Sequence, residues 1–320
     1  WAIKPMRPKV VIEMTTYHPH IPVLLNKSIE MLITDPNGIY VDATLGGGGH
    51  SLAILEATGT NATLYGLDQD REALNAASER IGEDSRFRPI QGNFGYLSTL
   101  LPPEIHGQID GILLDLGVST HQIRESQRGF SFQADGPLDM RMGEHTNVTA
   151  RQVVNEYSYE SLRDVIFHYG EEKRSRQIAR AIIEQRPLET TGDLRRVVEQ
   201  IVSGPKQVKS LARVFQAIRI EVNRELDVLK SALDQSLGLL KQNGRIVAIS
   251  YHSLEDRIVK TFFRSGNHED KLEKDFYGNL LRPIEPLHKK PVTPIRDEIS
   301  DNPAARSAKL RTARKTGEVL

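Results

Sequence analysis

Three aspartates stand at the ends of short runs of aliphatic and β-branched residues. These are Asp42, Asp68 and Asp115, and four consecutive glycines at 46–49 follow the first of them closely. Such runs predict buried strands, and strands that alternate with helices form a parallel sheet whose carboxyl ends meet at one edge. We therefore expect the three carboxylates to gather there. Acids beside a glycine-rich turn are typical of a site for a nucleotide-like ligand.

The glycine run within residues 38–51 narrows the class of ligand. Glycine lets a backbone approach a ligand closely and adopt positive φ, so strand, glycine turn and helix start together form a cradle. A dinucleotide fingerprint needs another glycine where this chain has Ser51 or Leu52, and no Gly-Lys-Ser/Thr follows to clamp a phosphate. S-adenosylmethionine fits this pattern, because it carries an amino group and a carboxylate but no phosphate.

Asp68, at the predicted tip of the second strand, is placed to accept hydrogen bonds from both ribose hydroxyls of an adenosine. A solvated turn acid is the alternative. Asp70 is a weaker candidate, since it could simply begin a helix over 71–80. Phe94, after the third strand, is expected either to pack on the adenine or to face the core.

The chain has no cysteine. This excludes disulfides, iron–sulfur clusters and zinc–thiolate sites. It also removes the usual nucleophile for covalent attack on a pyrimidine ring, on which methylation of carbon 5 depends. A methyl donor in this protein is therefore expected to act on nitrogen or oxygen. No His-Glu-x-x-His spacing is present either, and we expect no metal site.

Composition and periodicity predict an α/β protein with two lobes. The 320 residues, 38% of them apolar, can bury one large core or two smaller ones. Five strands are expected at 39–43, 62–67, 87–90, 109–114 and 245–250. Helical periodicity replaces the alternation at 149–155, 159–169, 171–185 and 191–202. The expected fold is an open parallel sheet with an inserted all-helical subdomain.

The expected boundaries follow this change of pattern. Residues 17–123 form the first part of the methyltransferase lobe, 124–210 the inserted loop and helical subdomain, and 211–320 the second part; residues 1–13 are interpreted as a leader or as added residues. An apolar stripe from Leu211 to Leu240 predicts one long helix. Beside it, Gln216, Arg219 and Asn223 are either a solvated flank or a substrate contact.

Candidate substrate contacts are scattered along the chain. The irregular loop 124–143 contains Arg128, Phe130, Phe132 and Arg141, which could stack a base and hold a phosphate, or could cover the lobe junction with the phenylalanines in the core. His252 is more often a structural histidine than a base, and Ser253 after it is the expected helix N-cap.

The segment 289–315 holds eight basic residues against three acids, although the whole chain has a net charge of zero. Arg306, Lys309 and Arg311 belong to it. Such an excess favours a phosphate backbone; an ordinary basic tail is the alternative.

Several long motifs resemble those of the RsmH (MraW) family of bacterial 16S ribosomal RNA cytosine-N4 methyltransferases. They lie at 20–25, 41–51, 128–132, 136–142, 215–220, 250–257 and 305–310. The resemblance implies contacts to S-adenosylmethionine from Gly48, Gly49, His50, Asp68, Phe94, Asp115 and Gln122. It also implies a Rossmann-like sheet of the class I methyltransferase kind with an inserted all-helical subdomain, and a decoding-site cytidine of 16S rRNA in the small subunit as substrate. Where the family commonly has His-Pro-Ala-Thr-Arg, this chain has Lys-Ser-Leu-Ala-Arg at 209–213, so no role of that histidine or proline is transferred.

Asp115 is the candidate catalytic residue, as acceptor of a hydrogen bond from the cytosine amine, and a backbone carbonyl of the loop 116–119 could share this role. Two alternatives stay open: a non-catalytic ribosome assembly factor that binds S-adenosylmethionine, and a methyltransferase for another nitrogen or oxygen acceptor. No apolar run approaches the length of a membrane span, so we expect a soluble, cytoplasmic protein without membrane contact. Its oligomeric state stays open, a homodimer included.

Overall fold

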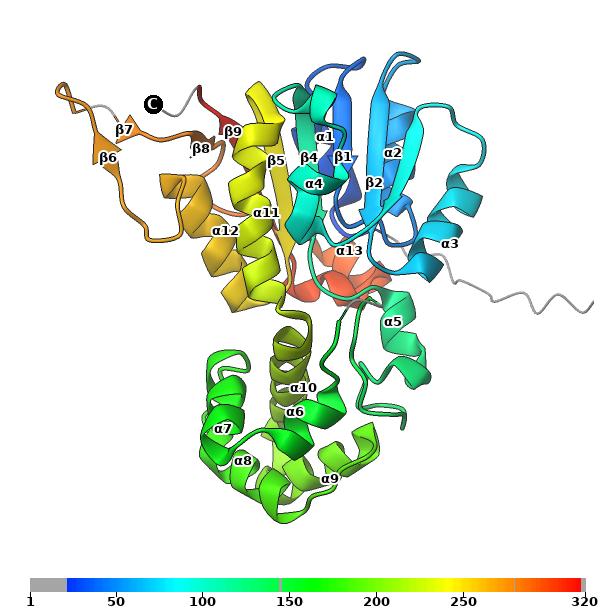
Figure 1. The fold of residues 1–320 in the computed structure, drawn as a ribbon, viewed down its shortest axis with the longest axis vertical. Coiled ribbons are helices and arrows are strands. Elements are labelled where there is room, and N and C mark those ends of the chain that lie inside the picture. The colour runs from blue at the N-terminus through cyan, green and yellow to red at the C-terminus, as the bar shows by residue number, and fades with distance from the viewer. Residues whose placement is uncertain (1–21, 144–145, 279, 318–320) are drawn as a thin grey trace, which may run out of the picture.

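The computed structural model describes residues 22–143, 146–278 and 280–317 and shows a sheet lobe above a helical lobe (Figure 1). The interpreted leader 1–13 lies outside the described residues. Five parallel strands were expected and are present, as β1 (Ile39–Asp42), β2 (Thr63–Asp68), β3 (Phe87–Gln91), β4 (Ile109–Asp115) and β5 (Leu240–Ser250). The α/β prediction is confirmed.

Within the described residues the main sheet has seven strands in the order β3-β2-β1-β4-β5-β9-β8. The chain runs outward from β1 to β3 on one side and from β4 to β5 on the other. The crossover direction therefore reverses between β1 and β4, and parallel sheets bind ligands at the carboxyl ends of the strands at such a reversal. The glycine loop after β1 lies at this point.

Helices cover both faces of the sheet. One face packs against α11 (Glu225–Leu239), α12 (Ser253–Ser265) and α4 (Leu97–Leu100), and the other against α1 (Leu25–Leu32), α2 (Gly49–Ala57) and α3 (Arg71–Ile81). Because both faces are covered, β4 is buried from Ile109 to Leu114. A continuous apolar run was therefore the correct signal for this strand.

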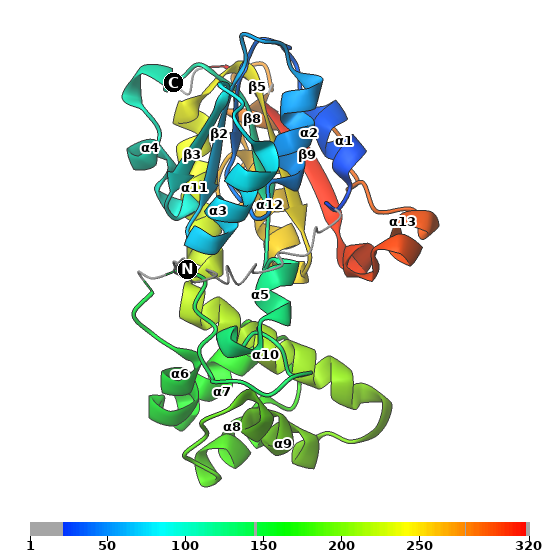
Figure 2. The same ribbon diagram turned by 90° about the vertical axis from the view of Figure 1, so that its right-hand side faces the viewer.

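The helical lobe has its own core. The lobe consists of α6 (Ala150–Glu156), α7 (Tyr159–His168), α8 (Ser175–Glu184), α9 (Thr191–Ile201) and α10 (Gln207–Asn223), and α5 (Thr120–Arg124) lies between the two lobes (Figure 2). Short 3₁₀ segments lie at Phe94–Tyr96, Pro103–Ile105, Ser126–Arg128, Gly204–Lys206 and Pro303–Ser307. Residues from the irregular loop, among them Phe130 and Leu138, complete this core.

The expectation of one long helix over 211–240 was wrong. The helix breaks at Arg224, which adopts a left-handed conformation with φ 50°. Leu211, Phe215 and Ile218 on α10 pack in the helical core, whereas Leu229 and Leu233 on α11 pack on the sheet. The apolar stripe continues in sequence, but its two halves face different cores. The expected domain boundary at 210/211 therefore falls too early, because α10 belongs to the helical lobe.

The basic C-terminal segment is part of the sheet, which was not predicted from the sequence. β9 (Lys309–Lys315) pairs antiparallel with β5, and β8 (Ile284–Pro286) pairs with β9. Leu310, Thr312 and Ala313 are buried between charged residues. A small hairpin, β6 (Glu273–Lys274) and β7 (Leu280–Leu281), and α13 (Arg296–Asp301) complete the described elements. No described helix is long and apolar enough to cross a membrane.

Candidate active site

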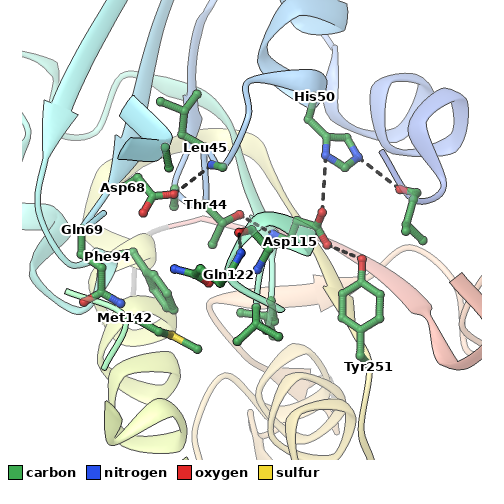
Figure 3. A pocket seen from close by; sticks show the side chains of 18 of the residues that line it. Thr44, Leu45, His50, Asp68, Gln69, Phe94, Asp115, Gln122, Met142 and Tyr251 are labelled. Carbon is green, nitrogen blue, oxygen red and sulfur yellow. Dashed lines mark hydrogen bonds and ion pairs between the residues drawn. The ribbon is translucent and has the colours of Figure 1, made fainter. Parts of the chain in front are cut away.

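A cavity of about 420 Å³ opens where β1, β2 and β4 end, and it reaches down to the helical lobe. Figure 3 shows Asp68, Phe94, Asp115 and Gln122 around it. Of the expected cofactor contacts, those on its wall are Gly49, His50, Asp68, Phe94, Asp115 and Gln122. Sequence motifs that are far apart along the chain are thus brought to one space.

The glycine loop leaves no room for side chains at the start of α2. A Cβ on Gly49 would stand 2.4 Å from Cγ of Pro22, which real structures do not tolerate. Gly46 adopts φ +49° and donates its N–H to Oδ2 of Asp68 at 2.9 Å. Gly48 packs against α3, where a Cβ on this glycine would stand 3.0 Å from Cβ of Ala77. The loop therefore presents backbone to the cavity.

Asp68 accepts a hydrogen bond on each carboxylate oxygen, from the N–H of Gly46 and from the N–H of Asp70 at 2.9 Å. Each oxygen keeps a further lone pair for a ligand hydroxyl. Burial raises the pKa of Asp68 to about 6, and the two backbone hydrogen bonds act against this rise. A ligand that donates hydroxyl hydrogens to this carboxylate would favour its ionised form.

Asp70 begins a helix, as the alternative interpretation of this residue expected. It caps α3, accepting from the N–H of Glu72. Its other oxygen accepts from Nε2 of Gln122 at 3.1 Å and Nη1 of Arg128 at 2.9 Å. Gln122 and the loop that contains Arg128 are thereby fixed against the sheet lobe.

Asp115 lies between two side chains at the centre of Figure 3. Tyr251 donates its hydroxyl to Oδ1 at 2.8 Å, and Nδ1 of His50 lies 3.6 Å from Oδ2. The Asp115 N–H donates to Oγ1 of Thr44 at 2.6 Å, which holds the end of β4 against β1. Burial raises the pKa of Asp115 to about 7, while the Tyr251 hydrogen bond opposes the rise.

One nitrogen of the His50 ring already has a hydrogen-bond partner within the protein. Nε2 lies 3.2 Å from the carbonyl of Val23, which only accepts, so the proton of the neutral ring is on Nε2. Nδ1 then faces Asp115 without a proton. Burial lowers the pKa of His50, so the ring is neutral at pH 7. The unprotonated Nδ1 therefore lies near the Asp115 carboxylate, at 3.6 Å and beyond hydrogen-bond distance.

The family model for the MraW methylase family matches residues 17–316. The chain belongs to this family. It is 45% identical over 306 residues to the ribosomal RNA small subunit methyltransferase H of Bacteroides fragilis, covering 95% of this chain and 99% of that protein. The enzyme of the same name from Amoebophilus asiaticus is 47% identical over 305 residues, covering 94% and 97%. An rRNA methylase structure from Streptococcus thermophilus has 12% identity and a TM-score of 0.39, covering 92% and 94%.

S-adenosylmethionine, the cofactor of this methylase family, fits the residues that line the cavity. The bare glycine backbone leaves space for the methionine part, and the Asp68 carboxylate has free lone pairs for the ribose. Phe94 lines the cavity and also packs against the sheet-lobe core, as its alternative expected, and its packing on the adenine stays a prediction.

Asp42 lies beneath the site. It is buried and accepts from Oγ of Ser51 at 2.7 Å, and its pKa is raised by burial. Ser51 on α2 and Asp42 on β1 hold the glycine loop between them, so this aspartate supports the site from below.

Charged side chains form a second wall on the side of the helical lobe. Arg219 donates from Nε and Nη2 to the two oxygens of Glu225, at 2.8 and 2.9 Å, and it lines the cavity. Gln216 lines it too, whereas Asn223 is buried and binds the backbone of Met140 and Met142. The polar flank of the predicted helix is therefore no solvated surface.

His252 also lines the cavity, but its ring has a structural contact. It is the N-cap of α12, and its Nδ1 accepts from the N–H of Glu255 at 3.5 Å. The expectation that Ser253 is the N-cap was therefore wrong, because the cap lies one residue earlier. The physical reason is that Glu255, third after His252, returns its carboxylate to the backbone of Tyr251 and His252.

Most of the other expected substrate residues lie outside the cavity. Phe130 is buried in the helical core, and the guanidinium of Arg128 lies over its ring. Phe132 is partly buried and packs against Phe215 with 5.4 Å between the ring centroids. Arg141 pairs with Asp139.

In the C-terminal segment, Lys309 and Arg311 both pair with Asp256, with Arg311 only 10% exposed. Arg306 is exposed, two residues after Ala304, which lines the cavity. The structure does not gather these basic residues into one site.

Four residues of the site were not found from the sequence: Thr44, Tyr251, Glu225 and Glu255. Tyr251 adjoins the predicted end of β5, and its position at a parallel strand end was a usable signal. Nothing in the sequence indicated that Glu225 holds Arg219, since this pairing depends on the break between α10 and α11.

Proposed function

We propose that this protein transfers a methyl group from S-adenosylmethionine to the exocyclic N4 amine of a decoding-site cytidine in 16S rRNA of the small ribosomal subunit. The observation that supports this best is the Asp115 carboxylate in the cofactor cavity, held by Tyr251 and facing the unprotonated nitrogen of His50. The printed names of the relatives supply the rRNA of the small subunit. The motif resemblance supplies the N4 position.

The chemistry requires positioning and a proton acceptor. The lone pair of the cytosine amine is delocalised into the ring, so the amine is a poor nucleophile and must be aimed at the methyl group. When bound, S-adenosylmethionine supplies an electrophilic methyl group on a sulfonium. Holding the amine in line within the cavity accounts for several kcal/mol of the barrier, on the order of 7–11 kcal/mol for well-oriented groups.

Asp115 then has two tasks. Its oxygen accepts a hydrogen bond from the amine, which favours a pyramidal nitrogen with its lone pair free to form the new N–C bond. As that bond forms and the S–C bond breaks, the amine loses a proton, which Asp115 takes. Burial, which raises the pKa of Asp115 to about 7, makes this carboxylate basic enough to take the proton. The absence of cysteine agrees with attack by nitrogen, which needs no covalent enzyme adduct.

A base can reach this cavity only after it leaves its stack. The cavity extends from the strand ends to Gln216 and Arg219 on the helical lobe, which leaves space beyond the cofactor contacts for a flipped base. Since the substrate is the small ribosomal subunit, we expect the enzyme to act in the cytoplasm.

The test is nucleoside mass analysis of small subunits that lack the modification, after incubation with the protein and S-adenosylmethionine. N4-methylcytidine at the decoding site is the expected product. Subunit binding without any methylated nucleoside would favour the assembly factor instead. A methyl group on protein or on another nucleoside would favour a different acceptor.

A further inference from the structure

The wall of the cavity opposite Asp68 contains a cation that the donor-binding residues do not explain. Arg219 comes from α10 in the helical lobe, and its side chain is only 14% exposed. Burial disfavours the charged guanidinium, but the charge and hydrogen bonds of Glu225 outweigh this and raise the pKa of Arg219. Arg219 is therefore a permanent positive charge with a fixed orientation.

The direction of its donors follows from the contacts. In the described part of the chain, Nε and Nη2 of Arg219 donate to Glu225. A guanidinium has five N–H donors in one plane, so the Nη1 amino group and the second N–H of Nη2 are the donors that we assign to a ligand in the cavity.

Glu255 links this cation to Asp115. It is buried, and its Oε2 accepts from the N–H of Tyr251 at 2.9 Å, whose hydroxyl binds Asp115. Burial acts against the Glu255 carboxylate, yet His252 and the charge of Arg219 lower its pKa. The cavity thus has an acceptor, Asp115, and a donor, Arg219, on its wall, with the buried Glu255 carboxylate held by the backbone of Tyr251 and stabilised by the charge of Arg219.

This arrangement matches one edge of cytosine. Along its Watson–Crick edge cytosine presents the N4 amine as donor and then N3 and O2 as acceptors. We propose that Arg219 is the specificity-determining residue of this site: it donates to N3 and O2 of the cytosine while Asp115 accepts from N4. Uracil would turn an N3–H toward the guanidinium, and that donor would find no acceptor. The inference rests on the proposed function, since it names how the same site reads its base.

A metal ion is the competing occupant of this wall. Glu225, His252 and Glu255 have ligand atoms within 4.8 Å of one another. However, both oxygens of Glu225 are bound by Arg219, and the permanent charge of Arg219 repels a second cation. The arginine already compensates these carboxylates, so the geometry favours recognition of a base.

The decisive experiment pairs a protein change with a substrate change. Small subunits are reconstituted with cytidine or with 3-deazacytidine at the target, which replaces the N3 acceptor by a C–H and keeps the N4 amine. Single-turnover rates of N4 methylation are measured for the wild type and for Arg219→Gln. Wild type should lose about 10- to 100-fold on the deaza substrate, and Arg219→Gln should lose as much on cytidine. The variant should show no further loss on the deaza substrate.

A matched control is present in the chain. Arg151 makes the same bidentate contact with Glu189, but this pair is 52% exposed on both sides and lies outside the cavity. Arg151→Gln should therefore keep the wild-type rate and the full deaza effect. Arg219→Lys, which keeps the charge but not the fork, should recover only part of the rate.

Folding is controlled by the double variant Arg219→Gln, Glu225→Gln, which removes both charges and leaves no buried unpaired carboxylate. It should fold, bind S-adenosylmethionine and show the same lack of response to the deaza substrate. If the losses from the variant and from the deaza base simply multiply, Arg219 does not contact N3 and the inference is wrong. If the wild type methylates neither substrate, the proposed function fails instead.

Discussion

The Asp115 carboxylate lies between the Tyr251 hydroxyl, which donates to it, and the neutral ring of His50. Tyr251 stabilises the ionised form, and burial favours the protonated one, with a pKa of about 7 as the balance. A carboxylate tuned near neutral pH is suited to proton transfer, since it is available as a base and still takes a proton readily.

Replacement of Asp115 by asparagine tests this directly. Asp115→Asn keeps the size of the side chain but removes the proton acceptor, so the rate of methyl transfer should fall about 100-fold or more. Affinity for S-adenosylmethionine, measured by calorimetry, should change only a few-fold. Asp164→Asn, at an exposed ion pair with Arg163, is the control. Full methyl transfer with lost donor affinity would make Asp115 a binding residue only.

The pKa of Asp68 sets an expected pH dependence of donor binding. With a pKa of about 6, the carboxylate is mostly protonated at pH 5 and mostly ionised at pH 7. We propose that the ionised form accepts both ribose hydroxyls, so affinity for S-adenosylmethionine at pH 5 should be about tenfold lower than at pH 7. Equilibrium dialysis across this range is the measurement.

The stability of the fold also depends on the protonation of Asp68, but it changes with pH in the direction opposite to the affinity for S-adenosylmethionine. The folded pKa of Asp68 is raised above the ordinary value of 3.8, so its contribution to stability is present at low pH and is lost as pH rises through about 6. A drop in donor affinity at pH 5 therefore cannot be ascribed to unfolding through Asp68. Asp68→Asn should bind weakly and show a flat profile, and a sloping one would point to another group.

At the scale of elements, the start of α2 depends on the absence of a side chain. Gly49→Ala would place a methyl group 2.4 Å from Pro22, so the loop must shift and donor affinity should fall at least tenfold. Gly238, exposed within α11, has open space where a Cβ would stand, with nothing within 4 Å. Gly238→Ala should keep the affinity and raise the free energy of unfolding by about 0.5–1 kcal/mol. Equal affinity for both variants would show that the Gly49 contact yields without cost.

How much the sequence predicts depends on how local the signal is. The parallel strands were predictable because burial on both faces leaves runs such as 109–114 almost free of polar residues. β9 was not, because its buried Leu310, Thr312 and Ala313 lie among charged residues such as Arg311, which pairs with Asp256 on α12. The break at Arg224 was hidden because both halves of the helix keep the same apolar spacing.

The site follows the same rule. Asp68 and Asp115 were predictable since each ends a strand. Arg219 was found only as part of a polar flank, because its partner Glu225 comes into reach only when the chain turns at residue 224. Contacts between the lobes have no counterpart in local periodicity.

At the scale of the whole molecule, the carboxylate of Asp256 on α12 fixes the C-terminal strand through Lys309 and Arg311. Burial opposes ionisation of Asp256, but the two basic side chains outweigh it and lower its pKa. This contribution to stability is therefore present above pH 3.8 and is lost as pH falls toward the lowered value.

Asp256→Ala would leave the mostly buried Arg311 without its partner, so we expect a loss of about 2 kcal/mol or more in the free energy of unfolding by denaturant. Asp164→Ala, at a more exposed pair, should cost less than about 1 kcal/mol. A similar loss for both variants would mean that Asp256 contributes no more than a surface pair.

The position of β9 in the sheet has a consequence for biosynthesis. β5, whose end leads into Tyr251, has β4 on one side and β9 on the other. Lys309, the first residue of β9, comes 59 residues after Ser250, the last residue of β5. While a ribosome is still making this chain, β5 has an open edge, which is a template for aggregation until residues 309–315 emerge. The strand that positions the active site is therefore completed late, and nascent chains should depend on that last pairing to become active.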